Sequence, residues 1–273
     1  MINIDKEKCI GCGKCVQDCI SRHLEISEGK AKRKSLNCIK CGHCIAICPK
    51  DAVSIDEYDM EEVKNYNKEE FSINPDYLLN FIKFRRSVRQ FENKEVEEEK
   101  ICKIIESGRF TQTGINLQDV SYVVVREGLQ ELKAMTLETL NKIGENILHN
   151  LTPEIMPFKK YADMWIQMYQ EYKKNPNGND KLFFNAPAVI IVTANSTING
   201  TLASSNMELM TNALGLGTFF SGFFVKAAQE NKRIMEFLGV EKGKQIVTCM
   251  IVGYPKVKYL RTVPRKEAQV YWM

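Results

Sequence analysis

Cysteine is the residue type in this sequence best suited to chemistry, because eight of the ten cysteines fall in two short runs. Each run has the spacing Cys-x-x-Cys-x-x-Cys-x-x-x-Cys, and the second begins 29 positions after the first. Three closely spaced thiolates can bind three irons of one 4Fe–4S cubane, while the fourth cysteine points away and binds the other cluster. We therefore predict two clusters, one bound by Cys9, Cys12, Cys15 and Cys48 and the other by Cys38, Cys41, Cys44 and Cys19.

A zinc site and a disulfide framework are the other uses of such closely spaced cysteines. A tetrahedral zinc site takes two Cys-x-x-Cys pairs rather than two runs of four. Small disulfide-rich domains belong to secreted chains, and residues 1–8 lack the apolar run of a signal peptide. We therefore expect iron–sulfur clusters in a cytoplasmic protein, with a purely structural cluster as the alternative to electron transfer.

The first 57 residues resemble the bacterial two-cluster ferredoxins. Pro49 follows Cys48, as that family's motif requires, whereas Ile20 follows Cys19 at a position where proline is usual. The departure bears on local geometry and potential rather than on ligation. The resemblance implies an electron-transfer module, which is too small to be stable without its clusters.

The length of 273 residues suggests two domains. We assign residues 1–57 to the cluster domain, 58–77 to a polar linker and 78–273 to a second domain, with a helix starting at Pro75. Periodicity in the second domain predicts alternating helices and strands, in an α+β or α/β arrangement. Helices are predicted over 96–107, 129–148, 158–174, 199–214 and 227–238, and strands over 121–126, 187–194 and 245–253.

Three arginines and a hydroxyl lie within five residues, Arg85-Arg86-Ser87-Val88-Arg89. Guanidinium groups make charge-assisted hydrogen bonds to phosphate, and a hydroxyl adds another donor. A solvated basic helix end, where cations interact favourably with the helix dipole, explains the same residues equally well. The motif alone leaves both interpretations open.

Residues 78–273 resemble the FMN-binding nitroreductase family, and this favours the phosphate site. Six motifs follow the family's order: Arg-x-Ser-x-Arg at 85–89, Asn-x-Gln at 116–118, Ala-Pro at 186–187, Ala-x-Gly-Leu-Gly at 213–217, Ser-Gly-Phe at 221–223, and Gly-Tyr-Pro at 253–255 before a basic tail. The resemblance implies an α+β fold with a central, mainly antiparallel sheet flanked by helices. It also implies FMN as cofactor and a homodimer with FMN at the interface.

The same resemblance implies roles for individual residues. Arg85, Ser87 and Arg89 would hold the FMN phosphate and ribityl chain, and Arg86 would contribute mainly backbone contact. Asn116 would reach the flavin of the other subunit. The other implied contacts are Gln118, Lys181 and Arg265, together with Ser221 and Gly222 near the reactive N5 of the flavin, and no other catalytic residue is implied.

The two resemblances together imply an oxidoreductase. An external low-potential donor, such as a ferredoxin, would reduce the clusters, and electrons would pass through FMN to a small organic acceptor of nitroaromatic, quinone or activated-alkene type. A non-enzymatic electron carrier or redox sensor is one alternative. An NAD(P)H-dependent nitroreductase that uses the clusters as an electron outlet is the other.

Charge and hydropathy argue against other partner classes. The net charge of +4 and the pI near 8.4 are too mild to favour nucleic acid or a membrane surface, and no apolar run is long enough to span a bilayer. The basic run 30–34 predicts either a docking site for an acidic donor or a solvated hairpin. The aromatic residues over 157–172 predict either a lid over the flavin or ordinary helix packing.

Overall fold

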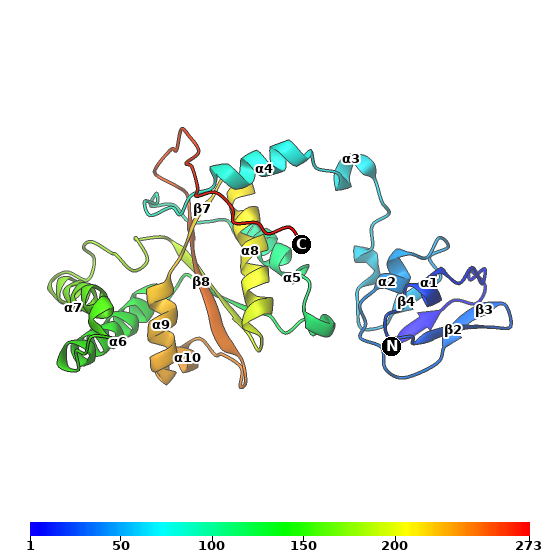
Figure 1. Cartoon of the computed structure of the whole chain (residues 1–273), viewed down its shortest axis with the longest axis horizontal. Coiled ribbons are helices and arrows are strands. Elements are labelled where there is room, and N and C mark those ends of the chain that lie inside the picture. The colour runs from blue at the N-terminus through cyan, green and yellow to red at the C-terminus, as the bar shows by residue number, and fades with distance from the viewer. The chain divides into compact units, whose positions relative to one another are not determined.

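A computed structural model describes residues 1–273, and its contacts divide the chain into two units. The N-terminal unit consists of residues 1–73 with 113–117, and the C-terminal unit of residues 74–112 with 118–273. Figure 1 labels the α-helices of both units and several of their strands. None of the helices combines the length and hydropathy that a bilayer-spanning segment requires.

Short strands and short helices make up the N-terminal unit. The helices α1 (Lys14–Gln17) and α2 (His43–Ala46) begin 29 residues apart, each after a glycine with a positive φ, Gly13 at 75° and Gly42 at 77°. The cysteine repeat is therefore also a repeat of backbone structure. The four strands form two antiparallel pairs, β1 (Ile2–Ile4) with β4 (Val53–Ile55) and β2 (Leu24–Ser27) with β3 (Lys30–Arg33). The short helices η1 (Met60–Glu62) and α3 (Lys68–Phe71) follow.

Cysteines form part of the small core of this unit. Ile2, Leu24 and Ile55 are buried there, and the cysteines Cys15 and Cys44 are buried beside them. A core of this size cannot stabilise a fold alone, because the apolar area removed from water is too small. The core is thus built around the residues expected to bind the clusters.

Helices make up most of the C-terminal unit. Asn74 caps the first of them by accepting hydrogen bonds from the amides of Asp76 and Tyr77, at 2.9 and 3.2 Å, and Pro75 occupies the first helical position as predicted. The helices are α4 (Pro75–Phe84), α5 (Glu98–Arg109), α6 (Leu129–His149), α7 (Lys159–Lys174), α8 (Thr197–Ala213), α9 (Gly222–Glu230) and α10 (Lys232–Phe237). Two short 3-10 turns, η2 (Gly114–Asn116, grouped with the N-terminal unit) and η3 (Met156–Phe158), precede β5 and α7.

A four-stranded sheet of order β5-β6-β8-β7 lies at the centre of this unit, and every neighbouring pair is antiparallel. The pairs are in register at Val123 with Ile191, Ile191 with Cys249, and Phe219 with Ile251. The strands are β5 (Ser121–Val125), β6 (Ala188–Ala194), β7 (Gly217–Phe220) and β8 (Gln245–Gly253).

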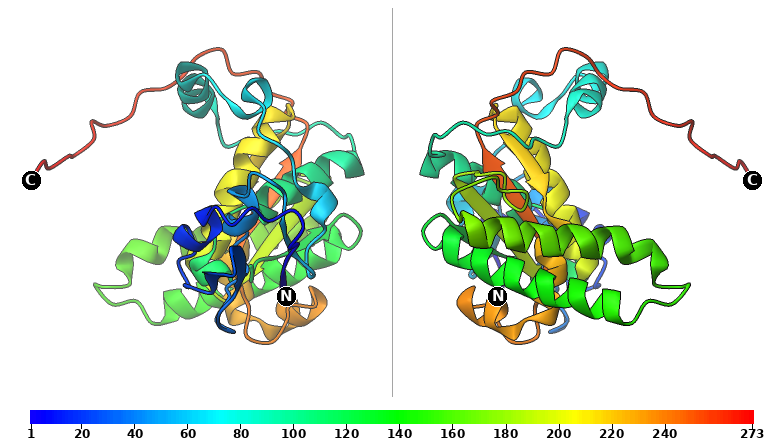
Figure 2. Two further views of the ribbon diagram at one scale, coloured as in Figure 1. Left: turned by 90° about the vertical axis from the view of Figure 1, so that its right-hand side faces the viewer. Right: turned by 90° about the vertical axis from the view of Figure 1, so that its left-hand side faces the viewer.

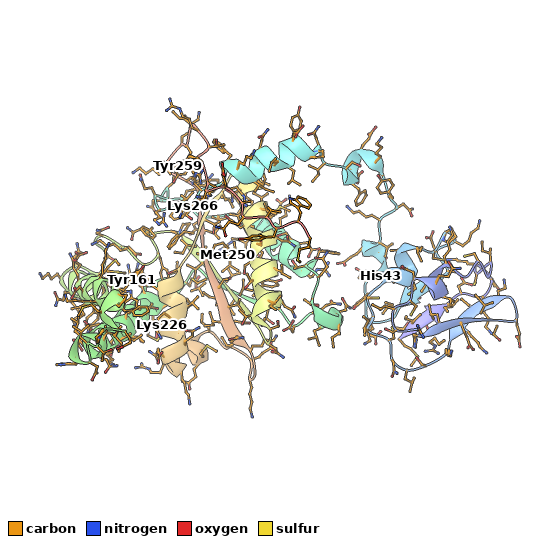
Figure 3. The ribbon with its side chains drawn as sticks, in the orientation of Figure 1. His43, Tyr161, Lys226, Met250, Tyr259 and Lys266 are labelled. Atoms are coloured by element: carbon orange, nitrogen blue, oxygen red, sulfur yellow. The ribbon has the colours of Figure 1, made fainter.

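Both faces of the sheet are covered by helices, so the unit has two cores. Because side chains alternate along a strand, Val189 and Ile191 pack with residues of α6, α7 and α9, whereas Ile190 and Val192 pack with residues of α5 and α8. All seven residues of β6 are buried. Met250 of β8 is likewise fully buried in the second core (Figure 3). The helices α6 and α7 run side by side as a long pair (Figure 2).

The predicted α+β class with a mainly antiparallel sheet is confirmed. The strand predicted over 245–253 is found with those bounds. The single helix predicted over 227–238 is wrong, because Asn231 separates α9 from α10 and its side chain accepts a hydrogen bond from the amide of Arg233 at 3.0 Å. The sequence interpretation missed strand β7, which forms a bridge with the arginine motif through Thr218 and Ser87.

Candidate functional site

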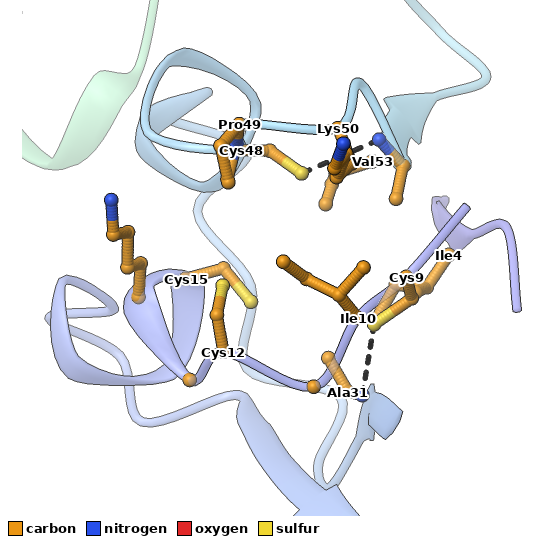
Figure 4. Close-up of a pocket in the computed structure, with 14 residues that line it drawn as sticks. Ile4, Cys9, Ile10, Cys12, Cys15, Ala31, Cys48, Pro49, Lys50 and Val53 are labelled. Atoms are coloured by element: carbon orange, nitrogen blue, oxygen red, sulfur yellow. Dashed lines mark hydrogen bonds between the residues drawn. The ribbon is translucent and has the colours of Figure 1, made fainter. Parts of the chain in front are cut away.

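Four of the predicted ligands surround one cavity in the N-terminal unit. Cys9, Cys12, Cys15 and Cys48 all line it, although 39 positions separate the first from the last. Their sulfur atoms face a shared space in Figure 4. The structure therefore brings together the four residues that the spacing assigned to the first cluster.

Backbone amides are directed at two of these sulfurs. The amide of Ala31 donates to Cys9 Sγ at 3.4 Å, and that of Ala52 donates to Cys48 Sγ at 3.3 Å (Figure 4). Gly11 has a φ of +66°, and a Cβ there would lie 2.0 Å from the carbonyl oxygen of Gly29. Only glycine fits, so the Cys-x-Gly-Cys turn can pack against the β2–β3 hairpin. Such amide donors stabilise the negative charge of cluster sulfurs.

Electrostatics links the same four thiols. Burial raises the pKa of Cys15 above its ordinary value, and negative charge on Cys48, Cys9 and Cys12 raises it further. Thiolates packed this closely in a partly apolar cavity need a bound cation to offset their charge. The donor set therefore fits an iron–sulfur cluster, whose irons supply that charge.

The second set of cysteines is grouped in a similar way. Burial raises the pKa of Cys44 to about 11, and the charges of Cys38 and Cys41 act in the same direction. The amide of Lys40 donates to Cys38 Sγ at 3.3 Å. The remaining predicted ligand, Cys19, accepts a hydrogen bond at its sulfur from the amide of His23 at 3.2 Å, and its role in the second cluster stays a prediction.

The arginine motif follows α4 in the C-terminal unit and lies against β7. Ser87 forms a parallel bridge with Thr218, and the amide of Val88 donates to the Thr218 carbonyl oxygen at 2.9 Å. Gly217 permits this approach, since a Cβ on it would lie 2.6 Å from Val88 Cγ2. The motif is thus an extended segment added to the edge of the sheet rather than part of a solvated helix end.

Several polar atoms beside this bridge are buried without a hydrogen-bond partner: Nε and Nη1 of Arg85, Nη2 of Arg86 and the hydroxyl oxygen of Thr218. Arg85 Nη1 lies 2.5 Å from Glu208 Oε2, an ion pair whose alignment does not satisfy a hydrogen bond. Unsatisfied buried donors are costly and rare in folded proteins. These guanidinium and hydroxyl donors fit a phosphate group such as that of FMN.

The two other members of the motif are exposed, and each has a contact. The guanidinium of Arg89 lies 4.5 Å from the centroid of the Phe219 ring, and the hydroxyl of Tyr259 donates to the carbonyl oxygen of Ser87 at 3.4 Å. Tyr259 belongs to the segment after β8, labelled in Figure 3. The hydroxyl of Ser87 and the donors of Arg89 remain accessible to a ligand.

Ser221 and Gly222 lie where β7 meets α9. The side chain of Ser221 is buried as the cap of α9, accepting from the amide of Phe224 at 3.4 Å and donating to the carbonyl oxygen of Leu182 at 3.5 Å. Gly222 is exposed, with no atom near the position of a Cβ. The hydroxyl of Ser221 therefore has a structural role, and the open backbone at Gly222 is the part that a flavin could approach.

The other predicted contacts have different surroundings. Asn116 is grouped with the N-terminal unit, where its amide donates to the carbonyl oxygens of Ile39 and Lys40, both at 3.0 Å. Gln118 has a positive φ of 48°. Lys181 forms an ion pair with Glu171 of α7 at 3.2 Å, and Arg265 lies in an exposed tail (Figure 2). The flavin roles of these four residues stay predictions.

Three aromatic side chains come together beside Gly222. Tyr161 and Trp165 of α7 both pack edge-on against Phe223 of α9, with ring centroids 6.2 and 5.6 Å apart. The indole nitrogen of Trp165 is buried without a partner, whereas Tyr161 is 45% exposed. The aromatic stripe of α7 is therefore core on one side and surface on the other, and its role as a lid over the flavin stays a prediction.

Sequence reasoning missed Glu208 and Thr218 as neighbours of the arginine motif. The sequence offered a clue to Thr218, because this residue directly follows the Ala-x-Gly-Leu-Gly motif at 213–217. Glu208 had none, because nothing in the pattern of α8 shows that this residue faces Arg85 from 123 positions away. Such a contact depends on the tertiary packing of α8 on the sheet.

Comparison with known proteins assigns both parts of the chain. Residues 82–254 match the Nitroreductase family, and residues 1–49 match the 4Fe-4S dicluster domain. A nitroreductase with bound FMN from Desulfitobacterium hafniense DCB-2 superimposes with a TM-score of 0.52 and 19% identity, covering 74% of this chain and all of that one. One with bound FMN from Bacteroides fragilis gives 0.51 and 18%, covering 73% of this chain and all of that one.

Proposed function

The chain belongs to the nitroreductase family of oxidoreductases, and on that premise we propose that it is an iron–sulfur flavoprotein. Electrons enter through two 4Fe–4S clusters, pass to FMN and reduce a small organic acceptor of nitroaromatic, quinone or activated-alkene type. The observation that carries the proposal is that one chain holds both a cavity lined by four cysteines and a set of buried guanidinium and hydroxyl groups without hydrogen-bond partners, of which only Arg85 Nη1 has an ion-pair partner. The cysteines matter to the proposal because clusters bound by them would give FMN a source of single electrons on the same chain.

When bound, the clusters supply one-electron transfer and FMN supplies the exchange between one-electron and two-electron chemistry. The chain's own residues hold and insulate these groups. The amides of Ala31 and Ala52 donate to cluster ligands, and Arg85 and Arg86 bind the phosphate. The exposed backbone of Gly222 leaves room for the flavin ring.

The acceptor would bind on the aromatic surface formed by α7 and α9. Tyr161, which is 45% exposed, and the partly exposed Phe223 offer aromatic surface to a planar molecule, and the buried Trp165 packs against Phe223. Aromatic stacking favours flat, conjugated acceptors, because offset-stacked rings attract through both dispersion and their quadrupoles. This is the property that nitroaromatics and quinones share.

A homodimer completes the proposed enzyme. Helix α4 has no buried residue, and Leu78, Leu79 and Ile82 on it are 39–48% exposed. The chain end is also apolar and exposed, with Trp272 at 94%. Two unpartnered apolar segments in one unit are what an intertwined second copy would cover.

Anaerobic rapid-mixing spectroscopy tests the relay. Dithionite or a photoreduced ferredoxin should bleach the cluster absorbance first and the flavin absorbance second, and an added quinone should then restore both. A Cys12→Ser variant should slow flavin bleaching while leaving FMN bound. The relay would be disproved if the clusters were reduced but the flavin never bleached. If NADH reduced the flavin faster than the clusters did, electrons would flow in the opposite direction, from FMN to the clusters.

Removal of the phosphate donors tests the flavin site. A charge-assisted hydrogen bond contributes roughly 1.5–3 kcal/mol, so Arg85→Ala should weaken FMN binding about 10- to 100-fold by fluorescence titration. Arg86→Ala should weaken it as well, because its Nη2 is buried without a partner. Arg233→Ala, an exposed arginine on α10, is the matched control and should leave the dissociation constant unchanged.

A further inference from the structure

A groove on the N-terminal unit is lined by residues at the start of the chain and by residues at the end of β3 and directly after it. Its floor includes Cys38, one of the predicted ligands of the second cluster, which is partly buried. The groove therefore extends to a residue that is predicted to bind a cluster. Its lining residues are Met1, Ile2, His23, Arg33, Lys34, Ser35, Leu36, Cys38, Lys40 and Glu57.

The charge of the groove is carried by two cations without ion-pair partners. Glu57 forms ion pairs with Lys40 at 2.7 Å and with the amine of Met1, which Asp56 also contacts at 3.4 Å, so these charges are largely compensated. Arg33 and Lys34 are exposed, and neither forms an ion pair. Their neighbour Lys32 is paired with Glu25 at 3.4 Å on the other side of the hairpin. The rim is thus positively charged where it meets solvent.

An apolar residue stands beside these cations. Leu36 is 92% exposed, two positions before Cys38. A single exposed leucine is unremarkable by itself. Next to two unpaired cations and above a cluster ligand, it adds the apolar contact that an interface core needs, while the cations form a polar rim.

We propose that this groove docks a small acidic electron-carrier protein, which delivers electrons to the cluster held by Cys38. The proposal deepens the proposed function and rests on it. Complementary charge argues for an acidic partner, because steering by surface charge raises association rates while leaving the complex weak enough to dissociate after each transfer. The small apolar contact suits such a transient complex, whose interface is at the low end of protein–protein contact areas.

The number of electrons transferred in each encounter determines how long the complex can last. In each encounter the reduced carrier loses one electron and the cluster ligated by Cys38 gains one, with no bond formed or broken. Two encounters supply the pair that a two-electron acceptor consumes, together with protons from water. The oxidised carrier must therefore leave between transfers, which is why a salt-sensitive, short-lived contact fits better than a tight one.

Charge reversal on the holoenzyme tests the docking site. Arg33→Glu/Lys34→Glu changes the charge by the same amount as the matched control Lys173→Glu/Lys174→Glu, an exposed lysine pair at the end of α7. The probe is an acidic ferredoxin with a single cluster, which carries one electron. Calorimetry with the oxidised probe measures binding, and stopped-flow mixing with the photoreduced probe measures cluster reduction, each over a range of salt concentrations.

We expect Arg33→Glu/Lys34→Glu to lower the second-order rate of cluster reduction by the ferredoxin about tenfold or more, to weaken binding and to flatten the salt dependence. Photoreduced 5-deazariboflavin, a small neutral reductant that needs no docking site, should reduce the variant at the wild-type rate. The control pair should behave as wild type. If iron content falls in the charge reversal, Arg33→Gln/Lys34→Gln must show an intermediate loss.

Several outcomes would overturn the proposal. These are unchanged ferredoxin binding in both groove variants, an equal loss in the control pair, or binding of the groove to phosphatidylserine vesicles in place of ferredoxin. Failure of the relay itself is distinguishable, because ferredoxin binding and cluster reduction are read without the flavin. Leu36→Ser should weaken binding without changing its salt dependence, since it removes only the apolar contact.

Discussion

The two units of this chain relate to their bound groups in opposite ways. In the N-terminal unit, three of the nine buried core residues are cysteines, Cys9, Cys15 and Cys44. In the C-terminal unit, β6 is buried along its whole length between two cores, and the phosphate donors lie at the edge of the sheet. The core of one unit contains its predicted ligands, whereas the other unit has complete cores of its own and carries its candidate site at the edge of the sheet.

This difference predicts different responses to ligand loss. Metal binding and folding are the same equilibrium in a domain that has no sufficient core of its own. A unit with a complete core loses only the binding free energy when its ligand leaves. Removing clusters should therefore unfold one unit, and removing FMN should leave the other folded.

The largest expected effect comes from removing a core ligand. Cys15→Ser, or iron chelation of the wild type under reducing conditions, should abolish cluster absorbance and leave residues 1–57 unfolded, because the thiol is both ligand and core. Hydrogen exchange with mass spectrometry should show lost protection there and unchanged protection in β6 and β8. Cys102→Ser, an exposed cysteine on α5, is the control. If the N-terminal unit kept its protection from hydrogen exchange without iron, its fold would not depend on the clusters, and the proposed difference between the two units would be wrong.

The second effect is on the C-terminal core itself. Lys133 and Asp180 form a buried ion pair at 3.7 Å, each side chain only 4% exposed, and Asp180 also accepts from the amides of Leu182 and Phe183. Lys133→Met would leave an uncompensated buried carboxylate, which costs roughly 3–5 kcal/mol. Thermal unfolding followed by circular dichroism would measure it.

Lys142→Met on the same helix is the control for this substitution. Lys142 pairs with Glu138 at 2.7 Å but is 69% exposed, and a helical surface pair contributes only about 0.3–0.5 kcal/mol. FMN content should follow the folded fraction in both variants. A Lys133→Met protein as stable as the control would show that the core does not depend on this pair.

A smaller effect should appear where the site meets the sheet. Gly217→Ala would press a methyl group against Val88, at 2.6 Å, and push the arginine segment away from β7. Overpacking of this kind costs roughly 1–3 kcal/mol, and FMN binding should weaken together with stability. Val88→Ala in the same chain should restore part of both losses, as a double-mutant cycle would measure. Independent, additive losses would mean that the two residues do not share this contact.

Sequence reasoning went furthest where chemistry fixes spacing. The cysteine runs identified the four residues that line the first cavity, because ligand geometry allows few alternatives. The strands β6 and β8 were predicted from apolar runs, which buried strands require. In the arginine motif, the sequence left a solvated helix end equally open, and the bridge between Ser87 and Thr218 decides against it.

The features that sequence reasoning missed depend on contacts between distant residues. β7 is four residues long, and its Gly217-Thr218 start was seen only as a turn. The break between α9 and α10 is set by the Asn231 side chain, which also donates to Thr139 of α6 at 2.7 Å. Asp119 accepts hydrogen bonds from the amides of Asn195 and Ser196 before α8, an anchor that its local sequence does not reveal. The local sequence pattern predicts which helices and strands form, but tertiary packing decides at which residues they end.

The smallest predicted effect is a pH dependence confined to the edge of the C-terminal unit. The hydroxyl of Tyr254 donates to Glu97 at 2.5 Å, and this bond, aided by Lys100 and Lys94, lowers the pKa of Glu97 to about 2. A carboxylate with a lowered pKa stabilises the fold above its unfolded pKa, near 4.5, and the contribution disappears as the pH falls toward 2. Tyr254→Phe removes the hydrogen bond but keeps the ring on which Lys94 lies at 3.8 Å.

The variant should therefore unfold at a slightly lower temperature than the wild type at pH 7, and the difference should shrink between pH 4.5 and pH 2. A carbon-13 titration of the Glu97 carboxyl should show its pKa rising toward the ordinary value in Tyr254→Phe. Because Glu97 belongs to a unit with its own core, this change should leave FMN content intact. A wild-type-minus-variant difference that stays constant with pH would mean that the hydroxyl acts through packing and not through the charge of Glu97.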